Sequence, residues 1–94
     1  MLDFTWNKRK NNLNKKKHGI SFEEAKSCFF DPMHLIIGDP DSSNSEYRLI
    51  LVGMSSFFKV LVVVHAEEIE NEIRIISARK ATKNERKEYE RVKR

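Results

Sequence analysis

The longest unbroken apolar run in this chain of 94 residues is Val60–Val64, which contains three consecutive valines. β-Branched residues favour strands, and a short apolar run closed by polar residues is typical of a buried strand. Spanning a bilayer takes about 20 apolar residues, so this run is far too short for a membrane helix. We therefore expect a strand over residues 59–65.

Three further segments have the pattern of strands. They cover residues 34–38, 47–52 and 72–79, with turn-forming residues at 39–45 and Gly53 at the end of the second segment. Short connections between consecutive strands favour antiparallel hairpins in a meander. A shorter strand is expected near the start of the chain, where Phe4 and Trp6 alternate with polar residues.

Two helices are expected between that first strand and the meander. The first covers residues 7–17 and has Leu13 as its one strongly apolar interior residue. The second begins at a capping box, in which Ser21 caps the Glu24 amide and the Glu24 side chain reaches back. Asp31–Pro32 ends this helix, because proline restricts the residue before it.

A last helix begins at a second capping box, formed by Thr82 and Glu85. Its apolar stripe is thin, mainly Tyr89 and Val92, so it is expected to dock weakly or to dock fully only on a partner. The predicted order is β-α-α-β-β-β-β-α, an α+β fold with helices packed on one side of a mainly antiparallel sheet. At this length we expect one domain over residues 1–94.

Charge is distributed unevenly along the chain. Residues 1–20 and 79–94 each have a net charge of +5, whereas residues 21–78 have a net charge of −6. Basic segments attract nucleic acid or an acidic partner protein, although solvated helix faces have the same pattern. The single cysteine excludes an internal disulfide framework, and the basic N-terminal segment lacks the apolar core of a signal peptide. These features predict a soluble cytoplasmic protein with no membrane partner.

The sequence has none of the strong motifs for metals or cofactors. It lacks Cys/His zinc spacing, a glycine-rich phosphate loop and a Gly-x-Ser-x-Gly elbow. No metal site and no cofactor are therefore expected. Cys28 is interpreted as a core thiol rather than a nucleophile, and Trp6 as a core anchor rather than a base-stacking residue.

One candidate functional group lies on the first predicted helix. Lys10, Asn14, Lys17 and His18 are spaced so that they share one side of the helix and its end. Their donors and the titratable imidazole suit contact with phosphate, whereas a solvated basic face is the structural alternative.

The other candidates lie on predicted strands. Glu46 and Arg48 share a strand face by alternation, either as a positioning pair or as a cross-strand ion pair. His65 ends the valine-rich strand, where it is either a general base or a polar terminus. Alternation places Arg79 on one face of the last strand and Arg74 on the other, each of them paired or facing an anion.

The order of these residues resembles the BrnT-like toxin family over nearly the whole chain. The opening signature is Phe4-x-Trp6-x3-Lys10-x3-Asn14-x2-Lys17-His18-Gly19-Ile20-Ser21-Phe22-Glu23-Glu24-Ala25. The closing signature is Ile73-Arg74-Ile75-Ile76-Ser77-Ala78-Arg79-Lys80-Ala81-Thr82, followed by Glu85 and Tyr89. Asn7 and Lys8 depart from the Asp-Pro that is usual in the family at the start of the first helix.

The resemblance implies a fold similar to RelE-like ribonucleases and the role of a toxin in a type II toxin–antitoxin pair. Such toxins cleave RNA and arrest translation. The implied partner is a small BrnA-like antitoxin, encoded beside the toxin, which binds it and represses their shared promoter. Operator DNA would then be contacted only through the antitoxin.

A metal-independent endoribonuclease would suit such a chain, because RNA supplies its own nucleophile, the 2′-hydroxyl. The protein then needs a base, an acid and groups that stabilise charge on the phosphate. We expect Arg74, Arg79 and Lys17 to stabilise that charge, and Arg48 to orient the phosphate or to help the acid step.

The expected base is His65, with His18 and Glu46 as alternatives. The residues expected to contact RNA are Lys10, Asn14, Lys17, Arg74 and Arg79. The alternative function is a non-catalytic module that binds nucleic acid or a protein partner through its basic ends.

Overall fold

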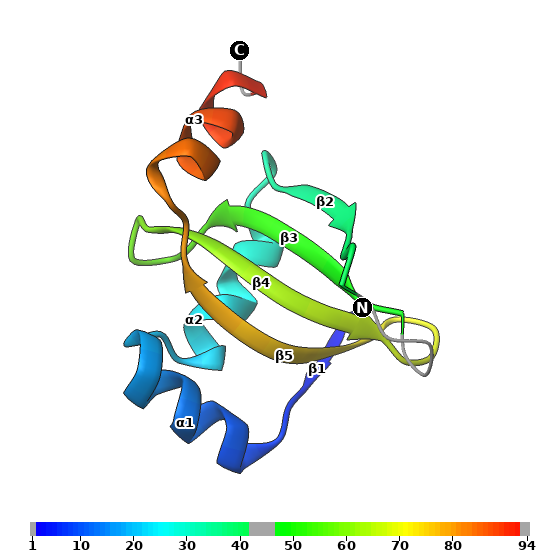
Figure 1. Ribbon diagram of the computed structural model, residues 1–94. Helices are drawn as coiled ribbons and strands as arrows, with labels where there is room; N and C mark the ends of the chain where they lie inside the picture. Colours follow the sequence, from blue (N-terminus) through cyan, green and yellow to red (C-terminus); the bar gives the residue numbers. More distant parts are fainter. Residues whose placement is uncertain (1, 42–46, 93–94) are drawn as a thin grey trace.

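The computed structural model describes residues 2–41 and 47–92, with only the backbone for Val92. The elements are β1 (Asp3–Thr5), α1 (Lys8–His18), α2 (Phe22–Ser27), the short 3-10 helix η1 (Cys28–Phe30), β2 (Leu35–Gly38), β3 (Leu49–Met54), β4 (Val60–Glu67), β5 (Glu72–Lys80) and α3 (Lys83–Val92) (Figure 1). The predicted α+β class and the predicted order of helices and strands are confirmed.

The sheet has five strands in the order β1-β5-β4-β3-β2. Strands β2 to β5 form the predicted antiparallel meander, and β1 lies parallel to β5 with Asp3 opposite Glu72. Gly53 does not end β3 as expected but lies within it, opposite Leu61. A Cβ at Gly53 would lie 3.0 Å from the Cys28 carbonyl oxygen, so the glycine allows η1 to approach the strand closely.

The helix caps follow the sequence closely, with one exception. Ser21 Oγ accepts from the Glu24 amide as predicted, at 3.0 Å. The Glu24 carboxylate does not reach back to the cap, because it accepts a 2.8 Å hydrogen bond from Ser55 Oγ on the β3–β4 turn. The second capping box is reciprocal, since Thr82 N donates to Glu85 Oε1 and the Glu85 amide donates to Thr82 Oγ1.

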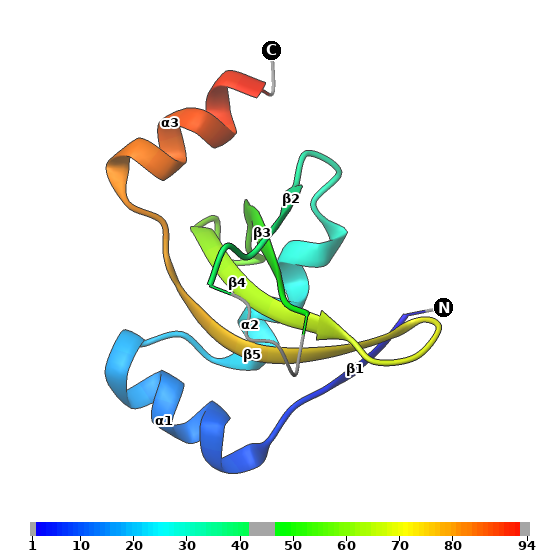
Figure 2. The same cartoon turned by 45° about the vertical axis from the view of Figure 1, so that its right-hand side comes forward.

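The sheet packs apolar residues on both faces. On one face α2 and η1 bury Phe22, Cys28 and Phe29 against strand residues such as Leu61 and Val63. On the opposite face the buried cluster is Val60, Val62, Ala81 and Tyr89. Because Tyr89 belongs to α3, the last helix does not share the side of α1 and α2 as expected, and Figure 2 shows α3 well apart from α1.

Helix α1 is anchored by a polar residue. Leu13, the expected apolar contact, is 54% exposed, whereas Asn14 is 7% exposed. The Asn14 amide group donates to the carbonyls of Ile20 and Ala78 at 2.9 and 2.8 Å, and its oxygen accepts from the Ala78 amide at 3.2 Å. Asn14 therefore attaches α1 to the loop that follows it and to β5.

Two residues have the structural roles predicted for them. Trp6 packs edge-to-face on Phe22, with ring centroids 6.1 Å apart. Cys28 is fully buried, and this burial raises the pKa of its thiol to about 12. Within residues 2–41 and 47–92, no helix has the length and apolar character that crossing a membrane requires.

Candidate functional site

The candidate site lies on the sheet face that carries Val52, Val62 and Arg79, here called the α3 face because Tyr89 of α3 packs on it. The register of β4 and β5 shifts at Val64/His65, so the two strands are out of step by one residue there. Such a bulge reverses the alternation of side chains beyond it.

The bulge brings Arg74 to the same face as Arg79. Arg74 lies between Ile73 and Ile75, both of which belong to the core covered by α2, as does Ala78 next to Arg79. Arg74 and Arg79 therefore both point away from that core. The expectation that they occupy opposite faces is wrong, because simple alternation does not include the bulge.

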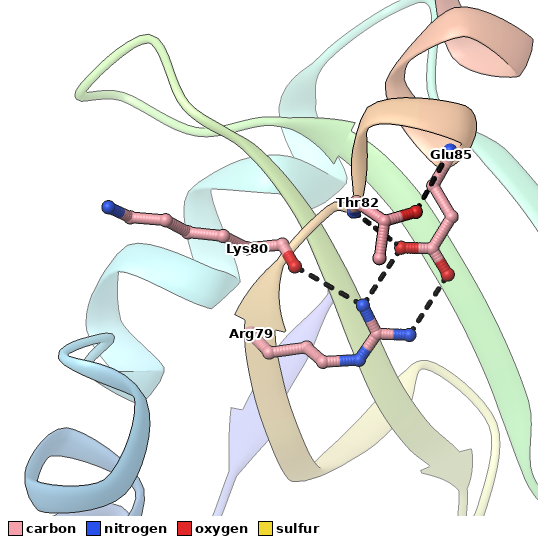
Figure 3. A network of polar contacts seen from close by, with 4 residues as sticks. All are labelled: Arg79, Lys80, Thr82 and Glu85. Atoms are coloured by element: carbon pink, nitrogen blue, oxygen red, sulfur yellow. Dashed lines mark hydrogen bonds and ion pairs between the residues drawn. The ribbon is translucent and has the colours of Figure 1, made fainter.

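The Arg79 guanidinium is held by the first turn of α3. Its Nη1 and Nη2 donate to the two carboxylate oxygens of Glu85 at 2.8 and 2.9 Å, and Nη1 also donates to the Lys80 carbonyl at 3.2 Å (Figure 3). These bonds hold the pKa of Glu85 down to about 2, chiefly through the hydrogen bonds from Arg79. The pair fixes the orientation of the guanidinium plane.

One edge of Arg79 is left open by this arrangement. Within the part of the chain that the structure describes, no acceptor contacts Nε or the second hydrogen of Nη2. The Arg79 side chain is 42% exposed. The Nε/Nη2 edge is a planar fork of two donors, which matches two oxygens of a phosphate or a carboxylate.

The other two candidate arginines also lie beside carboxylates. Arg74 Nε is 3.4 Å from Glu68 Oε2, and Arg48 Nε is 3.7 Å from Asp39 Oδ2 while its Nη2 donates to the Asp41 carbonyl. The Arg74 and Glu68 side chains are 28% and 40% exposed, whereas Asp39 is 10% exposed and the Arg48 Nε atom beside it is buried. Ion pairs at the surface are worth under about 1 kcal/mol, so a phosphate can exchange with the Glu68 carboxylate beside Arg74.

His65, the expected base, lies in the core instead of on the exposed sheet surface. It is fully buried, and its ring packs edge-to-face on Phe29 at 4.8 Å between centroids. Its Nδ1 lies 3.4 Å from the Val63 carbonyl, and burial lowers the pKa of the imidazole. A substrate on the α3 face cannot reach this ring without opening the core.

Helix α1 carries four of the candidates, and Asn14 attaches it to β5 at Ala78, next to Arg79. Lys10 and Lys17 are exposed and His18 is half-buried. Asn14 is buried beneath them and uses its amide nitrogen and its oxygen in bonds to the backbone. Glu46 lies outside the described residues.

A groove of about 430 Å³ lies between the α3 face and α3. Its floor is aliphatic, and Arg79, Glu85 and Glu88 stand among its lining residues. Sequence reasoning treated Glu85 only as a helix cap and missed its contact with Arg79. The available signal was an arginine six residues before a capping glutamate, at the junction of a strand and a helix.

Comparison with known proteins finds a matching family and a similar crystal structure. Residues 6–85 match the family described as the ribonuclease toxin BrnT of type II toxin–antitoxin systems. The 1.1 Å crystal structure of the Brucella abortus ribonuclease toxin BrnT is similar in fold, with a TM-score of 0.65 and 19% identity. The superposition covers 88% of this chain and 100% of that one. Among curated proteins, none matches the chain.

Proposed function

Since this chain belongs to the BrnT family of ribonuclease toxins of type II toxin–antitoxin systems, we propose that it is an endoribonuclease that cleaves RNA without a metal ion and thereby arrests translation. The observation that carries the proposal is the open Nε/Nη2 edge of Arg79, held in place by Glu85. It offers a fixed pair of donors where negative charge develops on a phosphate during cleavage.

The protein has to supply few groups for this reaction. The RNA 2′-hydroxyl attacks the adjacent phosphorus, its proton passes to a base, and the 5′-oxygen leaves with a proton from an acid. Arg79 binds the phosphate through its open edge, and Arg74 supplies a second positive charge from the same sheet face. Arg48 orients the phosphate or assists the acid step.

Basic residues outside the arginine group extend the RNA contact. Lys10 and Lys17 are exposed on α1 and attract the RNA backbone beyond the cleaved bond. For the base we retain His18 and Glu46 as alternatives and set His65 aside because it has no exposed surface. Asn14 is likewise set aside as an RNA contact because its polar atoms bind the backbone.

We further propose that the toxin acts in the cytoplasm and that its antitoxin is BrnA-like. Operator DNA is then contacted through the antitoxin alone. The chain itself is the component that acts on RNA.

The test uses the purified chain, without antitoxin and with EDTA, on end-labelled RNA. We expect fragments with 2′,3′-cyclic phosphate ends, and a rate about 10²–10³ lower for Arg79→Ala, by analogy with the loss of one charge-stabilising donor. Arg91→Ala is the matched control, because Arg91 is also an exposed arginine paired with a glutamate, Glu88, on α3. A translation extract read out in parallel tests the arrest of protein synthesis.

The alternative, a non-catalytic binding module, predicts a different result. RNA would remain intact with folded protein, and its binding would weaken steeply with salt. Cleavage that is unchanged in Arg79→Ala would refute the assignment of Arg79. Cleavage that EDTA abolishes would refute metal independence.

A further inference from the structure

The apolar floor of the groove between the α3 face and α3 has no role in the proposed cleavage, although Arg79 lines the same groove. Ile37, Ile50, Val52 and Val62 line it from the sheet, and Tyr89 lines it from α3. Ile37 is 59% exposed, although its strand neighbours are apolar. An aliphatic hollow of this size, open to solvent in a small basic protein, is typical of a site for a partner.

The chemistry of the groove favours a protein segment over RNA. Single-stranded RNA binds on exposed aromatic rings, whereas the one aromatic lining residue, Tyr89, is 1% exposed. At the rim, Glu85 is bound by Arg79, and Glu88 accepts from Arg91 at 2.5 Å. Among the charged lining residues that the structure describes, Arg79 is therefore the one that offers hydrogen-bond donors to a ligand, through its Nε/Nη2 edge.

We propose that the antitoxin docks in this groove with a short segment that places aliphatic side chains on Ile37 and Val52 and one carboxylate on the open edge of Arg79. The apolar floor and the open Nε/Nη2 edge of Arg79 are complementary to a segment of that composition. The guanidinium edge proposed to bind the RNA phosphate is then occupied, so antitoxin and RNA exclude each other. The inhibitory consequence rests on the proposed function, whereas the docking itself does not.

The test measures binding of the antitoxin encoded beside this chain by calorimetry with the full-length protein. Ile37→Asp places a charge on the groove floor and is expected to weaken binding at least about tenfold, as loss of an anchor in an interface does. Ile36→Asp is the matched control, because Ile36 is 44% exposed on the same strand but pairs with Leu51 of the core face. Arg79→Gln is expected to weaken binding as well.

The readouts separate this proposal from the proposed function. Both Asp variants should retain the melting temperature of the parent to within a few degrees and should still cleave RNA. Antitoxin binding that is unchanged in Ile37→Asp, or equally weakened in Ile36→Asp, overturns the docking site. Loss of RNA affinity in Ile37→Asp with normal antitoxin binding assigns the groove to the substrate and also overturns it. If the parent protein does not cleave RNA but Ile37→Asp weakens antitoxin binding, the proposed cleavage is refuted and the docking site is not.

Discussion

Replacing Asn14 with alanine should destabilise this protein more than replacing its apolar neighbour Leu13 with alanine. The substitution removes three hydrogen bonds and leaves the carbonyls of Ile20 and Ala78 and the amide of Ala78 without their partner. An unsatisfied buried polar group costs about 1–3 kcal/mol, so three of them cost about 3 kcal/mol at the lower end of that range. Domains of this size have a free energy of unfolding of about 5–15 kcal/mol, so the loss is a large share of it.

The measurement is urea unfolding followed by the fluorescence of Trp6, the one tryptophan of the chain. Trp6 packs on Phe22, so its emission reports on the core beside α1. We expect the free energy of unfolding to fall by about 3 kcal/mol in Asn14→Ala, within the range of buried network losses. In Leu13→Ala it should change by less than about 0.5 kcal/mol, because Leu13 is mostly exposed.

The two variants together decide between two views of α1. If Leu13→Ala costs more than Asn14→Ala, α1 is held by its apolar residue and the polar anchor is not its main attachment. A loss below about 1 kcal/mol in Asn14→Ala would show that water replaces the amide, which would refute the argument from unsatisfied groups. Asn14→Asp adds a check, because it keeps the size but cannot donate to two carbonyls, and it should be as damaging as alanine.

Three further predictions follow from single contacts. The pKa of Glu85 is lowered from 4.5 to about 2, so its pair with Arg79 stabilises the fold above pH 4.5. This contribution is lost as the pH falls towards 2. Acid unfolding monitored by circular dichroism should therefore be less steep over this pH range in Glu85→Gln than in the parent protein. An equally steep curve would show that the pair does not contribute. The Cys28 thiol, with a pKa of about 12, should react with iodoacetamide at pH 8 only after unfolding in urea, and rapid labelling of the native protein would contradict its burial. Tyr89→Phe removes the hydrogen bond to the Asp31 carboxylate and should lower the free energy of unfolding in urea by about 1.5–3 kcal/mol. A change under about 0.5 kcal/mol would show that α3 docks through the ring of Tyr89 and not through its hydroxyl.

Local signals predicted most of the fold. The capping residues Ser21 and Thr82 mark helix starts because a cap depends on residues three positions apart. The meander followed from short connections between apolar runs, and those connections leave few other topologies. Even the role of Cys28 followed from composition, since a lone cysteine is usually buried.

The site was less predictable because it depends on long-range geometry. A bulge at Val64/His65 decides which face Arg74 occupies, and no local pattern marks it. His65 is covered by Phe29 of η1, a contact that the sequence of β4 alone does not show. Asn14 looked like part of a basic surface because its partner, Ala78, lies in the last strand.

The pairing of β1 with β5 joins the two ends of the chain, with Asp3 beside Glu72. A nascent chain emerges from its N-terminus, so β1 has no partner strand until β5 has been translated. At about 5–20 residues per second, this interval is on the order of several seconds. The late strand also carries Arg79 and the Ala78 backbone that anchors α1. A growing polypeptide thus has neither the complete sheet nor the anchor of α1 until β5 has been made.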